Sequence, residues 1–151
     1  MAKKPGWSNA ELWQSLRDGS GCPICQKGHP LDVIAESDAI WVTAGREAPL
    51  PGYACVVSKR HVVEPHELPA REGRVFWEDA MTTARVLNQL FRPIKMNYEI
   101  HGNVIPHLHL HLYPRFEDDP YAIGPIASSP GVFTRSDEAL TQMADALCSA
   151  L

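Results

Sequence analysis

The chain has 151 residues, of which 44% are hydrophobic, and a formal net charge of −4. This length fits one compact domain with a full hydrophobic core. The mild acidity argues against a broad surface for a nucleic-acid backbone, because such binding depends on clustered lysine and arginine. No apolar run approaches the ~20 residues that span a bilayer. We therefore expect a single domain over residues 1–151, with neither a nucleic-acid polymer nor a membrane as partner.

The N-terminal part predicts a short helix and a cytoplasmic location. Residues 1–7 contain two lysines with no apolar stretch after them, so they do not resemble a signal peptide. Residues 8–18 have the spacing of an amphipathic helix, with Ser8 as the expected N-cap and Glu11 completing a capping box. In a reducing cytoplasm the four cysteines are metal ligands or buried thiols, and not a disulfide framework.

Cys22 and Cys25 stand three positions apart and are the first feature with chemical significance. On a tight turn such a pair can supply two of the four ligands of a tetrahedral zinc ion. A thioredoxin-like redox pair is one alternative, but that motif normally opens a helix directly after a strand, whereas this pair follows a helix and precedes a predicted loop. Plain structural thiols are the other. The candidates for the remaining zinc ligands are His29, His61, His66 and one member of the histidine row described below.

The rest of the chain alternates strand-like runs with one long helix. Strands are predicted at 31–36, 39–43, 53–58, 95–100 and 107–113, with a loop at 45–52 and a loop-rich segment from 116. Apolar residues at helical spacing predict a long helix over 70–91, and Ser136 caps a final helix over 136–147. This order predicts an α+β fold, in which a mostly antiparallel five-stranded sheet carries the long helix on one face.

Residues 107–113 alternate histidine with apolar side chains, in the order His-Leu-His-Leu-His-Leu-Tyr. Residues two apart on a strand point to the same face, so His107, His109 and His111 are expected on one side and the leucines in the core. Imidazoles about 6–7 Å apart along a strand need hydrogen-bond partners or a metal when buried; solvent-exposed histidines on an amphipathic strand are the alternative. Because three histidines of one strand fan out, we expect the first to join the cysteines and the second to face a substrate.

An imidazole can act as a nucleophile toward phosphorus and form a covalent phosphohistidine. It does so well when an acceptor holds its other ring nitrogen in the correct tautomer. Backbone N–H groups around Gly102 and Asn103 are candidates to hold the phosphate oxygens, since glycine lets the backbone approach closely. Lys59 and Arg60, at the end of the strand over 53–58, are either a solvated strand end or phosphate-facing cations.

The histidine row resembles the HφHφHφφ signature of the histidine triad (HIT) superfamily of nucleotide hydrolases and transferases. The similarity covers residues 22–115, flanked by the helix at 8–18 and by the loop and helix at 116–151. It includes the cysteine pair, the strand ending in Lys59-Arg60-His61, the long helix, Asn97, Gly102-Asn103, the row itself and Pro114-Arg115. The resemblance implies a HIT-like fold that forms a homodimer, with the sheet continuing across both protomers.

The resemblance also assigns roles within the row. It implies that His109 attacks the α-phosphorus of a nucleotide, and that His111 lies within hydrogen-bonding reach of the phosphate or the leaving group. It places Asn97, Gly102 and Asn103 among the substrate contacts, with Asn103 where many relatives carry glutamine. In zinc-containing bacterial relatives the metal ligands match Cys22, Cys25, His61 and His107, and that zinc is structural.

Three functional hypotheses follow from the resemblance. The first is a phosphoramidase or dinucleoside polyphosphate hydrolase that acts on a purine nucleotide through a nucleotidyl-histidine intermediate, without an organic cofactor. The second is a nucleotidyl transferase, and the third is a zinc-stabilised nucleotide-binding module with little catalysis. Many relatives offer an aspartate to the ribose, which the strand at 41–43 lacks; Glu36, Asp38 and Glu47 are the candidate replacements. We expect His29, His66 and His101 to be non-catalytic, with His101 the strongest candidate for an exception because it adjoins the phosphate turn.

Overall fold

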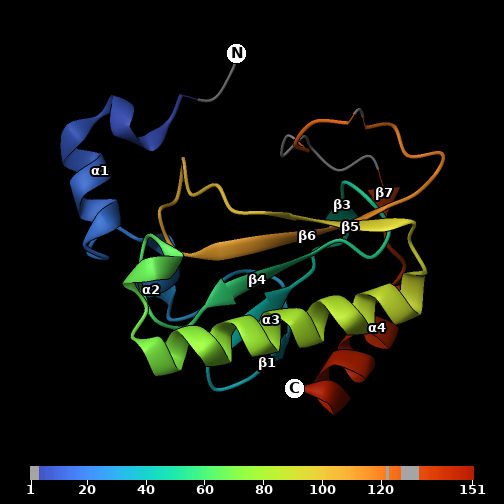
Figure 1. Ribbon diagram of the computed structural model, residues 1–151. Helices are drawn as coiled ribbons and strands as arrows, with labels where there is room; N and C mark the ends of the chain where they lie inside the picture. The colour runs from blue at the N-terminus through green and yellow to red at the C-terminus, as the bar shows by residue number, and fades with distance from the viewer. Residues whose placement is uncertain (1–3, 122, 127–132) are drawn as a thin grey trace.

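A computed structural model describes residues 4–121, 123–126 and 133–151 (Figure 1). Its elements in chain order are η1 (Gly6–Ser8), α1 (Ala10–Arg17), α2 (Pro23–Lys27), β1 (Val33–Glu36), β2 (Ile40–Thr43), β3 (Glu47–Ala48), β4 (Ala54–Ser58), η2 (Pro65–Glu67), α3 (Ala70–Phe91), β5 (Lys95–Glu99), β6 (His109–Arg115), β7 (Phe133–Thr134) and α4 (Asp137–Ala150). The predicted α+β class is confirmed. Within the described ranges, none of the helices has the length and apolar character needed to cross a membrane.

The main sheet has five antiparallel strands in the order β1-β2-β4-β6-β5. β4 lies at its centre, and all five of its residues are buried. The register sets Val57 of β4 opposite His109 and Cys55 opposite His111. On the other side of β6, the edge strand β5 sets Glu99 opposite His111. The histidines of β6 therefore lie between a buried central strand and an edge strand.

The hydrophobic core lies between this sheet and two helices. Figure 1 shows α3 crossing one side of the sheet, with α4 beside it. Leu108, Leu110 and Leu112 belong to the same core cluster as the buried side of α3, and full burial of a leucine stabilises the fold by about 1.5–3 kcal/mol. Because side chains alternate along a strand, this burial turns His109 and His111 to the face away from α3.

Several boundaries follow the prediction closely. The helix predicted at 70–91 has those bounds in the structure, and β1 and β2 form the predicted hairpin. Ser136 caps α4 through its side chain, which accepts from the N–H of Ala139 at 3.2 Å. Cys55 is buried as expected. Of the loop predicted after residue 115, positions 122 and 127–132, with Pro130 and Gly131, lie outside the described residues.

Other details differ from the prediction. The N-cap of α1 is Asn9, whose side chain accepts from the N–H of Leu12 at 3.0 Å; Ser8 is not the cap, because it ends a helical turn of its own. Residues 45–52 are not wholly loop, since β3 pairs with β7. β6 begins at His109, two residues later than predicted, and the N–H of Leu108 donates to the carbonyl oxygen of Val62, beyond the end of β4.

Candidate functional site

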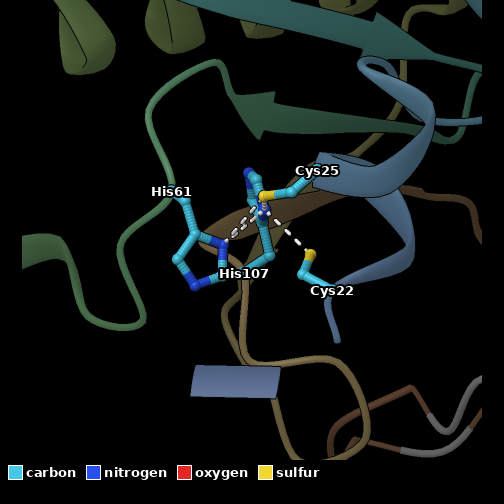
Figure 2. A group of neighbouring side chains, drawn as sticks. All are labelled: Cys22, Cys25, His61 and His107. Carbon is cyan, nitrogen blue, oxygen red and sulfur yellow. Dashed lines mark hydrogen bonds between the residues drawn. The ribbon is translucent and has the colours of Figure 1, made fainter. Parts of the chain in front are cut away.

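Four cysteine and histidine side chains from three segments of the chain meet beside the start of β6 (Figure 2). Cys22 is the N-cap of α2 and Cys25 lies within that helix, His61 follows β4, and His107 precedes β6. Their ligand atoms all lie within 4.8 Å of one another. His61 Nδ1 is 3.1 Å from His107 Nδ1 and 3.3 Å from Cys25 Sγ, and Cys22 Sγ is 3.4 Å from His107 Nδ1. The structure thus brings together the four residues that the resemblance implied as zinc ligands.

The two histidines of this cluster are held in the tautomer that a metal requires. Nε2 of His107 lies 2.8 Å from the carbonyl oxygen of Ser58, and Nε2 of His61 lies 2.9 Å from that of Arg17. A carbonyl oxygen only accepts hydrogen bonds, so each Nε2 carries the proton and each Nδ1 presents a lone pair. These two lone pairs face each other across 3.1 Å, an arrangement that a cation bound between them would stabilise.

The spacing of the cluster fits tetrahedral zinc. Zn–S bonds of about 2.3 Å and Zn–N bonds of about 2.0–2.1 Å place tetrahedral ligands roughly 3.3–3.8 Å apart. Four of the six separations in the cluster lie between 3.1 Å and 3.8 Å, and the other two do not exceed 4.8 Å. Cys22 and His107 are buried, and four protein ligands leave no open position for a substrate. The donor set therefore suits a structural ion and not a Lewis acid.

Two details of the sequence prediction for this region change. The cysteine pair opens a helix, with Cys22 as the N-cap and Pro23 in the first turn of α2, and is not followed directly by a loop. Of the four histidine positions considered as ligands, His29 and His66 are not in the cluster; His29 Nδ1 instead lies 2.8 Å from the carbonyl oxygen of Pro30.

A cleft of about 560 Å³ lies beside β6 and the turn that follows β5. Its walls include His109, His111, Gly102 and Asn103. Gly102 has a φ of +70°, a backbone conformation that glycine adopts without steric cost. Among the described residues, neither lysine nor arginine lines the cleft. An anionic ligand bound here would therefore be met by imidazoles and backbone N–H groups.

His107, a member of the cysteine–histidine cluster, orients His109 through its backbone. Its Nδ1 lies 2.6 Å from the carbonyl oxygen of His107. Since the carbonyl can only accept, Nδ1 carries the proton and Nε2 keeps its lone pair. His107 thus joins the cluster through its ring and fixes the tautomer of His109 through its backbone. The side chain that keeps this lone pair lines the cleft.

His111 belongs to a stack of aromatic rings with Tyr53 and Tyr113 at the wall of the cleft. Its ring centre is 4.9 Å from that of His109, and its Nδ1 lies 2.9 Å from the hydroxyl of Tyr53. Burial lowers the pKa of His111 to about 4, so its ring is neutral at pH 7. Burial also raises the pKa of Tyr53, which therefore remains a phenol. A hydroxyl that donates to Nδ1 leaves Nε2–H of His111 free to donate to a bound phosphate.

Other residues singled out in the sequence lie elsewhere. Asn97 lines a neighbouring hollow, which shares His101 with the cleft. Lys59 and Arg60 form ion pairs with Glu36 and Glu72 and do not line the cleft. The three acidic candidates for ribose binding, Glu36, Asp38 and Glu47, are likewise absent from its described walls.

Sequence reasoning missed two residues that support the site, Tyr53 and Glu99. Tyr53 starts an apolar run, and a buried tyrosine hydroxyl needs a hydrogen-bond partner, which is a signal that a polar group lies nearby. Glu99 is a carboxylate in a strand next to the histidine row, with only 10% of its side chain exposed. A charge so nearly buried requires partners, which the structure supplies through His101 and the backbone of Ile126.

Comparison with known protein families shows which family this chain belongs to. A family model described as the HIT domain matches residues 26–118. The chain belongs to the HIT family. An uncharacterised HIT-like protein of Methanocaldococcus jannaschii is 26% identical over 102 residues, covering 65% of this HIT chain and 79% of the relative.

Solved HIT structures share the fold. A histidine triad protein from Bradyrhizobium japonicum has a TM-score of 0.68 at 21% identity, covering 78% of this chain and 88% of its own. One from Marinobacter aquaeolei has a TM-score of 0.67 at 26% identity, and the match covers 79% of this chain and 87% of that protein. A zinc-bound histidine triad family protein from Mycobacterium smegmatis has a TM-score of 0.63 at 19% identity, and the match covers 86% of this chain and 95% of that protein. The predicted HIT-like fold is thereby confirmed.

Proposed function

We propose that this HIT protein hydrolyses a purine nucleotide, as a phosphoramidase or a dinucleoside polyphosphate hydrolase, through a nucleotidyl-histidine intermediate. The observation that carries the proposal is the tautomer of His109, whose Nδ1–H is held by the carbonyl of His107 so that Nε2 keeps its lone pair. Membership of the HIT family supports the same chemistry. His111 and the backbone at Gly102 and Asn103 line the same cleft and are placed to contact phosphate oxygens.

The proposed reaction has two displacements at phosphorus. Nε2 of His109 attacks the α-phosphorus, and the bond to the leaving group breaks, which leaves the nucleotidyl group on His109. Water then attacks the same phosphorus, the P–N bond breaks with its electron pair returning to Nε2 of His109, and the nucleoside monophosphate is released. Nε2–H of His111 donates to a phosphate oxygen during both steps. Nδ1–H of His109 stays on the carbonyl of His107 throughout, so the nucleophile keeps its orientation.

The proposed role of zinc is structural. Cys22, Cys25, His61 and His107 would hold the ion, as their converging lone pairs and thiol groups support. The zinc-bound relative from Mycobacterium smegmatis also supports this assignment. The bound ion would tie α2 to the start of β6, and so would hold the carbonyl that orients His109.

Turnover assays with two compounds, with and without an acceptor phosphate, and a binding assay with AMP separate the candidate functions. We expect release of AMP from adenosine 5′-phosphoramidate, from a diadenosine polyphosphate, or from both, in water alone. Transfer of the AMP group to an added acceptor phosphate, with no AMP released in water alone, would indicate the transferase instead. Binding of AMP without turnover of either compound would indicate the nucleotide-binding module and would contradict the proposed hydrolase.

We also propose that two copies join their sheets at β5. This strand is an edge of the sheet, and such an edge presents unpaired backbone groups that pair readily with a second chain. Tyr98 is 48% exposed on it, and the preceding Ile94 is 73% exposed. Light scattering at micromolar concentration should give twice the 16.8 kDa mass of the chain. A mass of one chain at every concentration would contradict the homodimer.

A further inference from the structure

A nearly buried carboxylate and a more exposed imidazole form a pair beside the cleft. Glu99 is 10% exposed, whereas the side chain of His101 is 42% exposed. Nε2 of His101 lies 2.8 Å from Oε2 of Glu99. The other carboxylate oxygen, Oε1, accepts from the N–H of Ile126 at 2.9 Å. Because both oxygens of Glu99 are engaged, the carboxylate is fixed and orients the imidazole in turn.

His101 faces the same space as the other site histidines. Its ring centre lies 5.8 Å from that of His111, and it lines the same cleft as His109. Nε2 donates to the carboxylate of Glu99, so Nδ1 is the nitrogen that can exchange a proton with a ligand. Within the described part of the chain, the hydrogen bonding of His101 runs through Nε2 alone.

The proposed reaction needs a proton donor that His109 and His111 do not provide. His109 keeps one nitrogen on a carbonyl and uses the other to attack phosphorus. His111 is neutral at pH 7, because burial lowers its pKa to about 4; a neutral imidazole donates a hydrogen bond but transfers its proton poorly. No lysine or arginine is found among the described lining residues. His101, which lines the cleft and is oriented by a fixed carboxylate, fills this gap.

We propose that His101, oriented by Glu99, is the general acid and base of this site. This assignment rests on the function proposed above. As Nε2 of His109 bonds to phosphorus, the leaving nitrogen or oxygen takes the electron pair of the broken bond and a proton from Nδ1 of His101. In the second step water bonds to phosphorus, its proton passes to Nδ1 of His101, and the electron pair of the P–N bond returns to His109. One water is consumed, and both histidines return to their starting state.

Two substrates with different leaving groups test this role. The first substrate is the phosphoramidate of AMP with tryptamine, whose amine leaves only when it is protonated. The second is the p-nitrophenyl ester of AMP, from which p-nitrophenolate leaves without a proton. We expect His101→Gln to lower kcat/KM for the phosphoramidate by about 10²-fold or more, a typical contribution of general acid catalysis. For the nitrophenyl ester the expected loss is less than about 3-fold, because no proton is needed. Glutamine retains a donor for Glu99, and His66→Gln serves as a matched control outside the cleft.

The outcomes separate this role from the proposed function. Equal losses on both substrates in His101→Gln, or no loss on either, overturn the general-acid assignment. If either result is seen and His109→Ala turns over neither substrate, the proposed function still stands. Turnover of both substrates by His109→Ala would instead overturn the proposed function itself.

Glu99→Gln supplies a second, independent readout, because it leaves His101 in place and changes the partner of its Nε2. If Glu99 orients the general acid, the loss in kcat/KM should again be larger for the phosphoramidate than for the nitrophenyl ester. Equal losses on the two substrates would count against the pair.

Discussion

Replacement of His109 by alanine is expected to lower kcat/KM for a nucleoside phosphoramidate by at least about 10⁴-fold, since the loss of a nucleophile removes the whole covalent route. The fold should survive, because His109 lies on the face of β6 away from the leucines of the core. Steady-state kinetics of His109→Ala, with a thermal melt to confirm folding, make the measurement.

The matched control is His66→Ala, which removes one histidine from outside both the cleft and the metal cluster. It should leave kcat/KM within about twofold of the parent, since surface substitutions away from special features have small effects. Full activity in His109→Ala would exclude this residue as the nucleophile. The hydrolytic chemistry would then have to use another group in the cleft.

Replacement of Cys22 by alanine should abolish stoichiometric zinc and lower stability by about 3–4 kcal/mol. A ligand present at a thousand times its Kd stabilises the folded state by about 4 kcal/mol, and removal of one of four ligands forfeits most of this. For a domain of this size the melting temperature should fall by roughly 10 °C. Metal analysis of the purified protein and a thermal melt check both parts of the expectation.

The activity of Cys22→Ala distinguishes a structural from a catalytic ion. We expect stability to fall more than the activity per folded molecule, because the closed ligand set leaves no position for a substrate. Cys148→Ala is the control, since this thiol is exposed and lies outside the cluster. Active parent protein with no more than trace metal would refute the zinc site. A greater loss of activity than of stability would point to a catalytic metal.

Much of the fold was predictable because hydrophobic periodicity reports which side chains are buried. The stripe over Ala70–Phe91 fixed the bounds of α3, and the alternating leucines of 107–113 fixed the inner face of β6. The first helix was less predictable, since Ser8 and Asn9 are both good N-caps and only the preceding helical turn decides between them. β3 was not predictable, because a two-residue strand depends on a partner, β7, far along the chain.

The site was predictable where chemistry depends on residue type and family pattern. The cysteine pair, His61 and His107 converge as implied, and His109 and His111 share a cleft. The tautomer of His109 could not be predicted from the sequence, because it depends on a hydrogen bond to the carbonyl oxygen of His107, whose own ring lies in the cysteine–histidine cluster. The support from Tyr53 and Glu99 was also not accessible.

The missing information concerns pairing between strands. Tyr53 reaches His111 from the start of β4, while Glu99 lies opposite His111 across the β5–β6 register. Neither relation is encoded in local spacing, since a shift of one residue in register would turn each side chain to the other face. Only the assembled sheet brings these residues to the histidines.

The stereochemical course at phosphorus tests the covalent intermediate most directly. A nucleoside phosphoramidate made chiral at phosphorus by one sulfur atom is hydrolysed in ¹⁸O-labelled water, and the configuration of the product is determined. Each in-line displacement inverts phosphorus, so the two displacements through His109 predict overall retention, even when the intermediate does not accumulate. Inversion would show a single direct attack by water and would contradict the nucleotidyl-histidine mechanism.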